Sequence, residues 1–100
     1  MSAGGEDNAG AVRHEAGARR FVVRLADGEA ELGYDATRPG TLELHHTFVP
    51  ESARGRGVGE RLVTAAMDHA RETGVKIIPT CPFVRSWVEE HPEVRDLISR

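Results

Sequence analysis

The middle of the chain alternates polar and apolar positions in the manner of β-strands. Residues 21–25 are rich in branched and aromatic side chains, and residues 29–34 and 41–49 alternate polar with apolar positions. Asp27-Gly28 and Pro39-Gly40 separate the three segments, and both pairs favour tight turns. We therefore expect an antiparallel meander of three strands.

The third segment should present two different faces, because successive side chains of a strand point in opposite directions. His45 would then lie on one face and His46 on the other, so at most one of the two histidines would serve a given site. The face of His46 would carry the apolar positions, which are Leu42, Leu44 and Phe48.

The second half of the chain changes to a helical period. Apolar residues recur at steps of three and four from Leu62 to Thr73, which predicts a helix over residues 59–73 that ends at Gly74. Residues 75–78 form a short strand, which should run parallel to the third strand because a helix separates them. The fold class is therefore α+β (α/β), with a mixed, mostly antiparallel sheet and one main helix.

Two short helices should complete the C-terminal end. Thr80-Cys81-Pro82 is a typical helix start, since Pro suits the first helical position. Pro92 interrupts that helix, and residues 93–98 form a last short one. The buried stripe of the first of these helices would consist of Phe83, Val84, Trp87 and Val88.

Composition divides the chain into a tail and one domain. Residues 1–19 are rich in Gly, Ala and charge and carry almost no large apolar side chain, so we expect a disordered N-terminal tail and a single domain over residues 20–100. The formal net charge of -3 gives no general attraction to nucleic acids or anionic membranes. No apolar run approaches the roughly 20 residues of a membrane-spanning helix. We therefore expect a cytoplasmic protein, a monomer or a homodimer, with no nucleic-acid or membrane partner.

The strongest chemical signal is Arg54-Gly55-Arg56-Gly57-Val58-Gly59, which follows a strand and opens a helix. Glycines let backbone N–H groups approach a ligand closely, and the free N–H groups and dipole of a helix N-terminus attract anions. The arginines add positive charge, so the segment predicts a pyrophosphate site. A tight connection without a ligand is the alternative interpretation.

Two common phosphate-binding loops do not fit this segment. A Walker loop needs Lys and then Ser or Thr after its last glycine, whereas Glu60 and Arg61 follow Gly59. A dinucleotide fingerprint counted from Gly55 and Gly57 would need a third glycine at position 60, and the preceding strands look antiparallel.

The spacing Arg-x-x-Gly-x-Gly, formed by Arg54, Gly57 and Gly59, resembles the acyl-CoA pyrophosphate loop of the GNAT-type N-acetyltransferase superfamily. Two further blocks, residues 46–50 and 78–84, resemble the minimal NATD-like or YjdJ-like branch of that superfamily. The resemblance covers about residues 21–97 and implies a small GNAT-like core.

The resemblance implies transfer of an acetyl group from acetyl-CoA to an amine, with coenzyme A as cosubstrate and with no metal. The pantetheine arm would pair with the backbone near Thr47 to Val49, and the N–H of Phe48 or Val49 would hold the developing oxyanion. The residues expected to contact the cofactor are Thr47, Phe48, Val49, Arg54, Gly55, Arg56, Gly57, Val58, Gly59, Cys81, Pro82 and Phe83.

Cys81 and His46 are the candidate catalytic residues. Cys81 lies at a helix start, where N–H groups and the helix dipole lower the pKa of a thiol. It would accept the acetyl group or protonate the leaving CoA thiolate, or else it is a small buried residue. The resemblance favours His46 over His45 as the general base, and a hydrogen-bonded core histidine is the other interpretation. Many larger relatives use a tyrosine as the acid, but Tyr34 lies in an early strand.

The sequence leaves the acceptor open. Between Arg24 and Leu32 there is room for a hairpin alone, so the acceptor-binding helices of larger members are missing. A protein, a polyamine or a small amine all fit this pattern. The histidines and Cys81 show no zinc-ligand spacing. Two alternatives to an N-acetyltransferase are a CoA-binding module without turnover and a protein-interaction domain.

Overall fold

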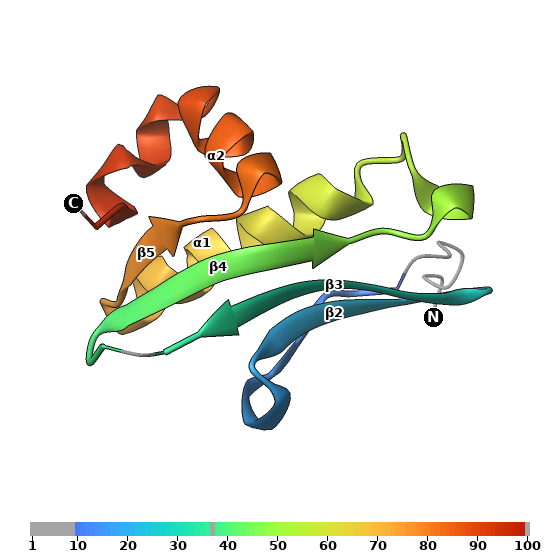
Figure 1. Ribbon diagram of the computed structural model, residues 1–100, viewed down its shortest axis with the longest axis horizontal. Coiled ribbons are helices and arrows are strands. Elements are labelled where there is room, and N and C mark those ends of the chain that lie inside the picture. The colour runs from blue at the N-terminus through green and yellow to red at the C-terminus, as the bar shows by residue number, and fades with distance from the viewer. Residues whose placement is uncertain (1–9, 37, 100) are drawn as a thin grey trace.

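The computed structural model describes residues 10–36 and 38–99. Its centre is a five-stranded sheet in the order β1-β2-β3-β4-β5, with α1 behind the sheet and α2 near β5 (Figure 1). The strands are β1 Arg13–Glu15, β2 Arg20–Leu25, β3 Gly28–Asp35, β4 Thr41–Phe48 and β5 Lys76–Pro79. The helices are α1 Val58–Thr73 and α2 Pro82–Glu89, and short 3-10 helices span Ala16–Ala18, Glu51–Ala53 and Pro92–Leu97.

The strands pair as the alternation predicts. β2, β3 and β4 form the antiparallel meander, and β5 runs parallel to β4 after the crossover through α1. The predicted α+β class, with a mixed sheet, one main helix and short C-terminal helices, is therefore confirmed. Within residues 10–36 and 38–99, none of the helices combines the length and the apolar character that crossing a lipid bilayer requires.

One face of the sheet builds the core and the other is mostly charged. Phe21, Leu32 and Leu44 are fully buried, and α1 covers them with Leu62 and Val63. Each such side chain contributes about 1.5–3 kcal/mol when it leaves water. On the opposite face, charged residues of β2 and β3 stand side by side, as in the pair of Arg24 with Glu29. This charged face of the sheet is called the open face below.

A β-bulge in β4 changes which residues share a face. Tyr34 of β3 pairs with Leu44, and Gly33 pairs with His46, so His45 is an extra residue between two regular pairs. An inserted residue reverses the alternation beyond it. The alternation of polar and apolar residues in the sequence cannot reveal such an insertion. Predictions of strand faces that rest on this alternation therefore fail after Leu44.

Two predictions on the third strand were wrong for this reason. His46 and Phe48 do not share the core face with Leu44, because they pair with Gly33 and Glu31 of the open face. Thr47 takes the core face instead, opposite the buried Leu32. The bulge thus moves His46 out of the core and brings Thr47 towards the helices.

β4 and β5 separate at Leu44, the residue directly before the bulge. Their pairing runs from Thr41 with Lys76 to Leu44 with Pro79 and stops there. The Leu44 carbonyl then accepts hydrogen bonds from the backbone N–H groups of Thr80 and Cys81, at 3.1 and 2.9 Å. In the part of the chain that the structure describes, β4 continues to Phe48 without a strand neighbour on this side. The result is a fork whose open end faces the start of α1.

The helix boundaries agree closely with the predicted ones. α1 begins after Gly57 and ends at Gly74, whose φ of 84° places it in the left-handed conformation expected of a helix-ending glycine. The helix start predicted at Thr80-Cys81-Pro82 is confirmed, with Cys81 as the N-cap of α2, and Val84 is buried. The assignment of Phe83 to the buried stripe was wrong, because this residue is 38% exposed. Its ring packs against Gly59 of α1, which has no side chain to keep it away.

The chain before Arg20 is more ordered than composition predicts. β1 adds an antiparallel edge strand beside β2, so the predicted disorder over residues 1–19 was wrong for residues 13–19, while residues 1–9 lie outside the described residues. His14 anchors β1 by stacking on Phe21, with ring centroids 4.3 Å apart, and by a hydrogen bond of 2.5 Å to the Tyr34 hydroxyl. The segment was predicted to be disordered because it lacks large apolar residues. Polar and aromatic contacts stabilise it instead.

Stability should fall as the pH drops through the titration of His14. Burial, and then the nearby His69, lower the pKa of His14 below its usual 6.5. The unfolded chain therefore binds the proton more readily, and this contribution to stability is present above about pH 6.5 and lost below the folded pKa. Urea unfolding between pH 8 and 5 checks this. His14→Gln should flatten the dependence, and an equally steep dependence in that variant would contradict the assignment.

Candidate active site

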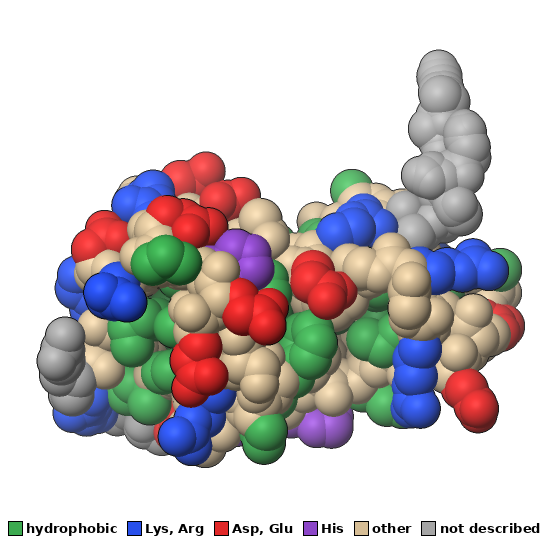
Figure 2. Space-filling view, turned by 90° about the horizontal axis from the view of Figure 1, so that it is seen from above, with side chains coloured by type: hydrophobic (Ala, Val, Ile, Leu, Met, Phe, Trp, Pro, Cys, Tyr) green, Lys and Arg blue, Asp and Glu red, His purple; other side chains and the backbone are tan. Residues whose placement is uncertain are grey.

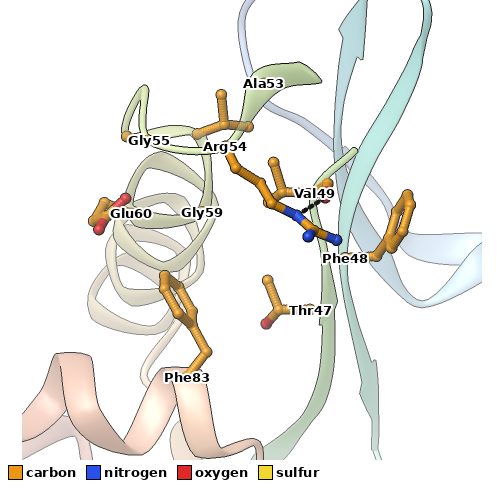
Figure 3. A pocket seen from close by; sticks show the side chains of 11 residues that line it. Thr47, Phe48, Val49, Ala53, Arg54, Gly55, Gly59, Glu60 and Phe83 are labelled. Carbon is orange, nitrogen blue, oxygen red and sulfur yellow. Dashed lines mark hydrogen bonds between the residues drawn. The ribbon is translucent and has the colours of Figure 1, made fainter. Parts of the chain in front are cut away.

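A pocket of about 470 Å³ occupies the open end of the fork (Figure 3). The end of β4, the loop that follows it, the start of α1 and one side chain of α2 form its wall. From above, hydrophobic side chains reach the surface in the middle of the molecule, with Lys and Arg side chains towards both ends (Figure 2). The lining residues are Thr47, Phe48, Val49, Ala53, Arg54, Gly55, Gly57, Val58, Gly59, Glu60 and Phe83.

The glycine-rich loop folds into a cradle. Gly55 and Gly57 have φ of 81° and 78°, in the left-handed region that side chains rarely adopt. A Cβ at Gly55 would meet nothing within 4 Å, so that position is open. Gly59 has a different role, since a Cβ there would lie 2.8 Å from the Phe83 ring. Two glycines thus provide the turn, and the third allows α2 to approach α1.

Arg54 joins the loop to the end of β4. Its Nε donates a hydrogen bond of 2.9 Å to the Val49 carbonyl (Figure 3). This contact holds the guanidinium at the pocket while the free N–H groups at the start of α1 lie across from it. A positive side chain and a helix N-terminus then flank the same space, which suits a phosphate-bearing ligand.

The pocket contains most of the predicted cofactor residues. Arg56, Cys81 and Pro82 are the exceptions, since none of them lines it. Ala53 and Glu60 line it although the sequence interpretation did not include them. The sequence position of Glu60 could have indicated that it lines the pocket. Glu60 follows Gly59 directly and lies in the first turn of α1, whose N-terminus forms part of the pocket wall.

Thr47 separates the pocket from Cys81. The bulge turns Thr47 to the helix side of β4, where its Oγ1 lies 3.4 Å from the Sγ of Cys81. Cys81 itself is 6% exposed. Thr47 and Phe83 face each other across the pocket, and the Phe48 ring points to the far side of β4 (Figure 3). A group in the pocket therefore meets the Thr47 hydroxyl before it meets the thiol.

The two histidines lie on the open face, not in the core and not in this pocket. Both line a second pocket of about 330 Å³ on that face. His45 Nε2 lies 3.4 Å from a carboxylate oxygen of Asp35, and His46 Nε2 lies 3.8 Å from one of Glu31. The prediction that they point to opposite faces was wrong, because the bulge at His45 puts both on one side.

Arg20 organises the charges around the second pocket. Its guanidinium lies 2.7 Å from Glu15, 3.2 Å from Glu29 and 2.8 Å from Glu31. The hydrogen bonds that Arg20 donates to Glu31 and Glu15 raise the pKa of Arg20, and the one to Glu15 lowers the pKa of Glu15. Among the described residues, no group of three or more His, Cys, Asp or Glu side chains is arranged to hold a metal ion.

Comparison with known proteins first defines the class. The solution structure of a GCN5-like protein from Staphylococcus aureus matches with a TM-score of 0.71, at 28% identity, over 88% of this chain and 86% of that one. Its description places the fold among the N-acetyltransferases.

The family follows from the sequence matches. The family model of GCN5-related N-acetyl-transferases matches residues 20–97. Protein NATD1 from Xenopus tropicalis and from Homo sapiens are 39% and 36% identical over 83 residues, which is 81% of this chain and 76% and 74% of theirs. The chain therefore belongs to the GCN5-related N-acetyltransferase family, and its resemblance to the minimal NATD-like branch is confirmed.

Proposed function

We propose that this protein transfers an acetyl group from acetyl-CoA to an amine. The observation that carries the proposal is the continuity of the first pocket, which joins the glycine cradle at the start of α1 to the free edge of β4. Among the described residues no strand pairs with this edge beyond Leu44, and an anion site beside it matches a ligand that has phosphates at one end and an amide-rich arm at the other.

The two parts of the pocket would bind different parts of the cofactor. The pyrophosphate would lie against the N–H groups of residues 55–59, with Arg54 beside it. The pantetheine amides would pair with the β4 backbone beyond Leu44, as an added strand does. The N–H of Phe48 or Val49 would then polarise the thioester carbonyl, and one such donor typically contributes about 10²–10³ in rate.

The reaction needs one proton to leave the amine and one to reach the sulfur. The amine nitrogen attacks the carbonyl carbon, the C–N bond forms, and the C–S bond breaks with its electron pair left on sulfur. The Thr47 hydroxyl lines the pocket and touches the Cys81 thiol. We assign these two side chains to the path by which a proton reaches the CoA thiolate.

Release of free CoA thiol from acetyl-CoA tests the proposal. The assay is run with a panel of primary amines and is paired with thermal unfolding in the presence of acetyl-CoA. A ligand at 100 times its Kd adds about 2.7 kcal/mol, which should raise the Tm by about 10 °C or more. Stabilisation without thiol release would indicate a CoA-binding module, and neither effect at millimolar acetyl-CoA would leave an interaction domain.

Substitution of Cys81 should separate its two proposed roles. Cys81→Ala should lower kcat by about 10²-fold if the thiol feeds protons through Thr47, because general acid catalysis typically contributes that much or more. Cys81→Ser should then recover much of the rate. If Cys81 instead carries the acetyl group, intact mass spectrometry of the wild type with acetyl-CoA should show one added acetyl group that both variants lack. Full activity in Cys81→Ala would exclude both roles.

A further inference from the structure

The wall of the first pocket carries charges of both signs. Among the described residues that line it, the ionised side chains are those of Arg54 and Glu60. They lie on opposite sides of Gly59, with Arg54 towards β4 (Figure 3). A phosphate-bearing ligand is attracted by the guanidinium and by the helix N-terminus, whereas the carboxylate repels it. The pocket therefore attracts anions less strongly than the arginine and the glycine loop alone would.

Glu60 occupies the position from which a side chain can reach back over the start of α1. Gly57 is the N-cap, so Glu60 is the third residue of the helix, the place of the acidic residue in a capping box. Its Oε1 lies 4.0 Å from the point where a Cβ on Gly57 would stand. Gly57 has no side chain with which to cap the helix. The Glu60 carboxylate thus lies near the N–H groups that would bind a phosphate.

The positive end of α1 is shared between two anions. An acidic side chain in the first turn stabilises a helix through the helix dipole. The next residue, Arg61, donates a hydrogen bond of 2.5 Å to the Gly10 carbonyl, so its guanidinium is engaged by the N-terminal segment. A phosphate at this helix end would draw on the same N–H groups and the same dipole that stabilise Glu60.

We propose that Glu60 is an internal competitor for the glycine cradle. Its carboxylate stabilises the start of α1 while the cradle is empty, and a phosphate-bearing ligand must displace it or bind against its charge. The assignment rests on the proposed function in so far as the natural ligand is the pyrophosphate of acetyl-CoA. The affinity of the cradle is then set by the difference between the two anions.

Such a competitor favours exchange of the cofactor. The pyrophosphate is the same in acetyl-CoA and in CoA, so a contact with it stabilises substrate and product equally and does not lower the barrier to acetyl transfer. A strong phosphate contact would hold the product as firmly as the substrate, and product release limits the rate of many enzymes. Glu60 weakens both complexes by the same factor and so shortens the residence of CoA.

Glu60→Gln should tighten anion binding and also destabilise the empty protein. Backbone-amide NMR of the full chain, titrated with inorganic pyrophosphate at low ionic strength, should show shifts at residues 55–60 in both proteins. The Kd should be about three- to tenfold lower in the variant, the effect of removing one like charge near an exposed anion. Added salt should reduce this difference. Without ligand, the variant should melt a few degrees below the wild type, because the first turn loses its acidic residue. A purely structural role would produce the second effect without the first.

Glu51→Gln is the matched control for this variant. Glu51 is exposed, precedes the same loop and does not line the pocket. Its substitution removes the same charge and should leave the Kd of pyrophosphate nearly unchanged. Equal pyrophosphate affinity in the wild type and in Glu60→Gln, an equal gain in Glu51→Gln, or no shifts at residues 55–60 in any of the proteins would overturn the assignment.

Titrations with acetyl-CoA and CoA distinguish this assignment from the proposed function. Isothermal titration calorimetry should show that Glu60→Gln lowers the Kd of both ligands by the same factor. A gain for one ligand without the other would contradict a contact with the phosphates that they share. Tighter pyrophosphate binding in Glu60→Gln, with no acetyl-CoA binding in either protein, would refute the proposed function and still support the competition by Glu60.

Discussion

Gly57→Asp is expected to weaken acetyl-CoA binding about a hundredfold or more. Gly57 has φ of 78°, and a Cβ there would have no neighbour closer than 4.0 Å, so the new side chain would project into the space of the cradle. The carboxylate would meet the pyrophosphate directly and offset the attraction of the helix N-terminus. A hundredfold loss corresponds to about 2.7 kcal/mol of binding free energy, which isothermal titration calorimetry resolves easily.

Gly40→Asp is a matched control for this variant. Gly40 has φ of 77°, also has open space at its Cβ position, and lies in the turn before β4, away from the pocket. Both variants place a side chain in the left-handed conformation, at a cost of about 1–2 kcal/mol each. Thermal unfolding should therefore show similar losses in the two variants. Equal affinity for acetyl-CoA in both would mean that the glycine loop is a plain connection.

Leu44→Ala is expected to lower the free energy of unfolding by about 2–5 kcal/mol, the usual cost of removing a fully buried leucine side chain. Leu44 is 0% exposed, pairs with both Tyr34 and Pro79, and is the last residue before the fork. The loss would be a large part of the 5–15 kcal/mol that holds a domain of this kind folded.

Leu25→Ala provides the comparison for urea unfolding, because Leu25 lies at the end of β2 and is only partly buried. It should cost about 1 kcal/mol or less, since much of its surface is already in water. A loss below about 1 kcal/mol in Leu44→Ala would contradict the position of this residue at the centre of the core.

The predictable part of the fold is the part governed by local patterns. The alternation of residues 29–34, the helical period of residues 59–73 and the stop at Gly74 each describe one element, and the structure agrees with them. The parallel pairing of β5 followed from the order of elements alone. These features depend on neighbours in the sequence, so a single chain is enough to infer them.

The features that the sequence did not predict depend on contacts between distant segments. The bulge at His45 depends on how β4 pairs with Gly33 and Tyr34 of β3, and no local sequence pattern specifies this pairing. His14 holds β1 in place through its contacts with Phe21 and Tyr34. Because His14 is a polar residue, the composition of residues 10–19 gave no sign of these contacts. The predicted face of His46 was wrong for the first reason, and the predicted length of the tail was wrong for the second.

The same distinction between local patterns and distant contacts applies to the candidate site. The glycine loop is contiguous, so its role as a pocket wall could be inferred from Arg54 to Gly59. The contact of Thr47 with Cys81 joins residues 34 positions apart, and the second pocket combines β2, β3 and β4. Assignments of Cys81 and His46 to one site depended on faces that the bulge rearranges.

Backbone-amide NMR during a titration with acetyl-CoA tests the central claim most directly. If the fork and the glycine cradle form the cofactor site, the largest shifts at saturation should fall at residues 46–49 and 55–60, with the open-face residues of β2 and β3 nearly unchanged. Saturation with no shifts in these two segments, or with shifts concentrated elsewhere, would contradict the account.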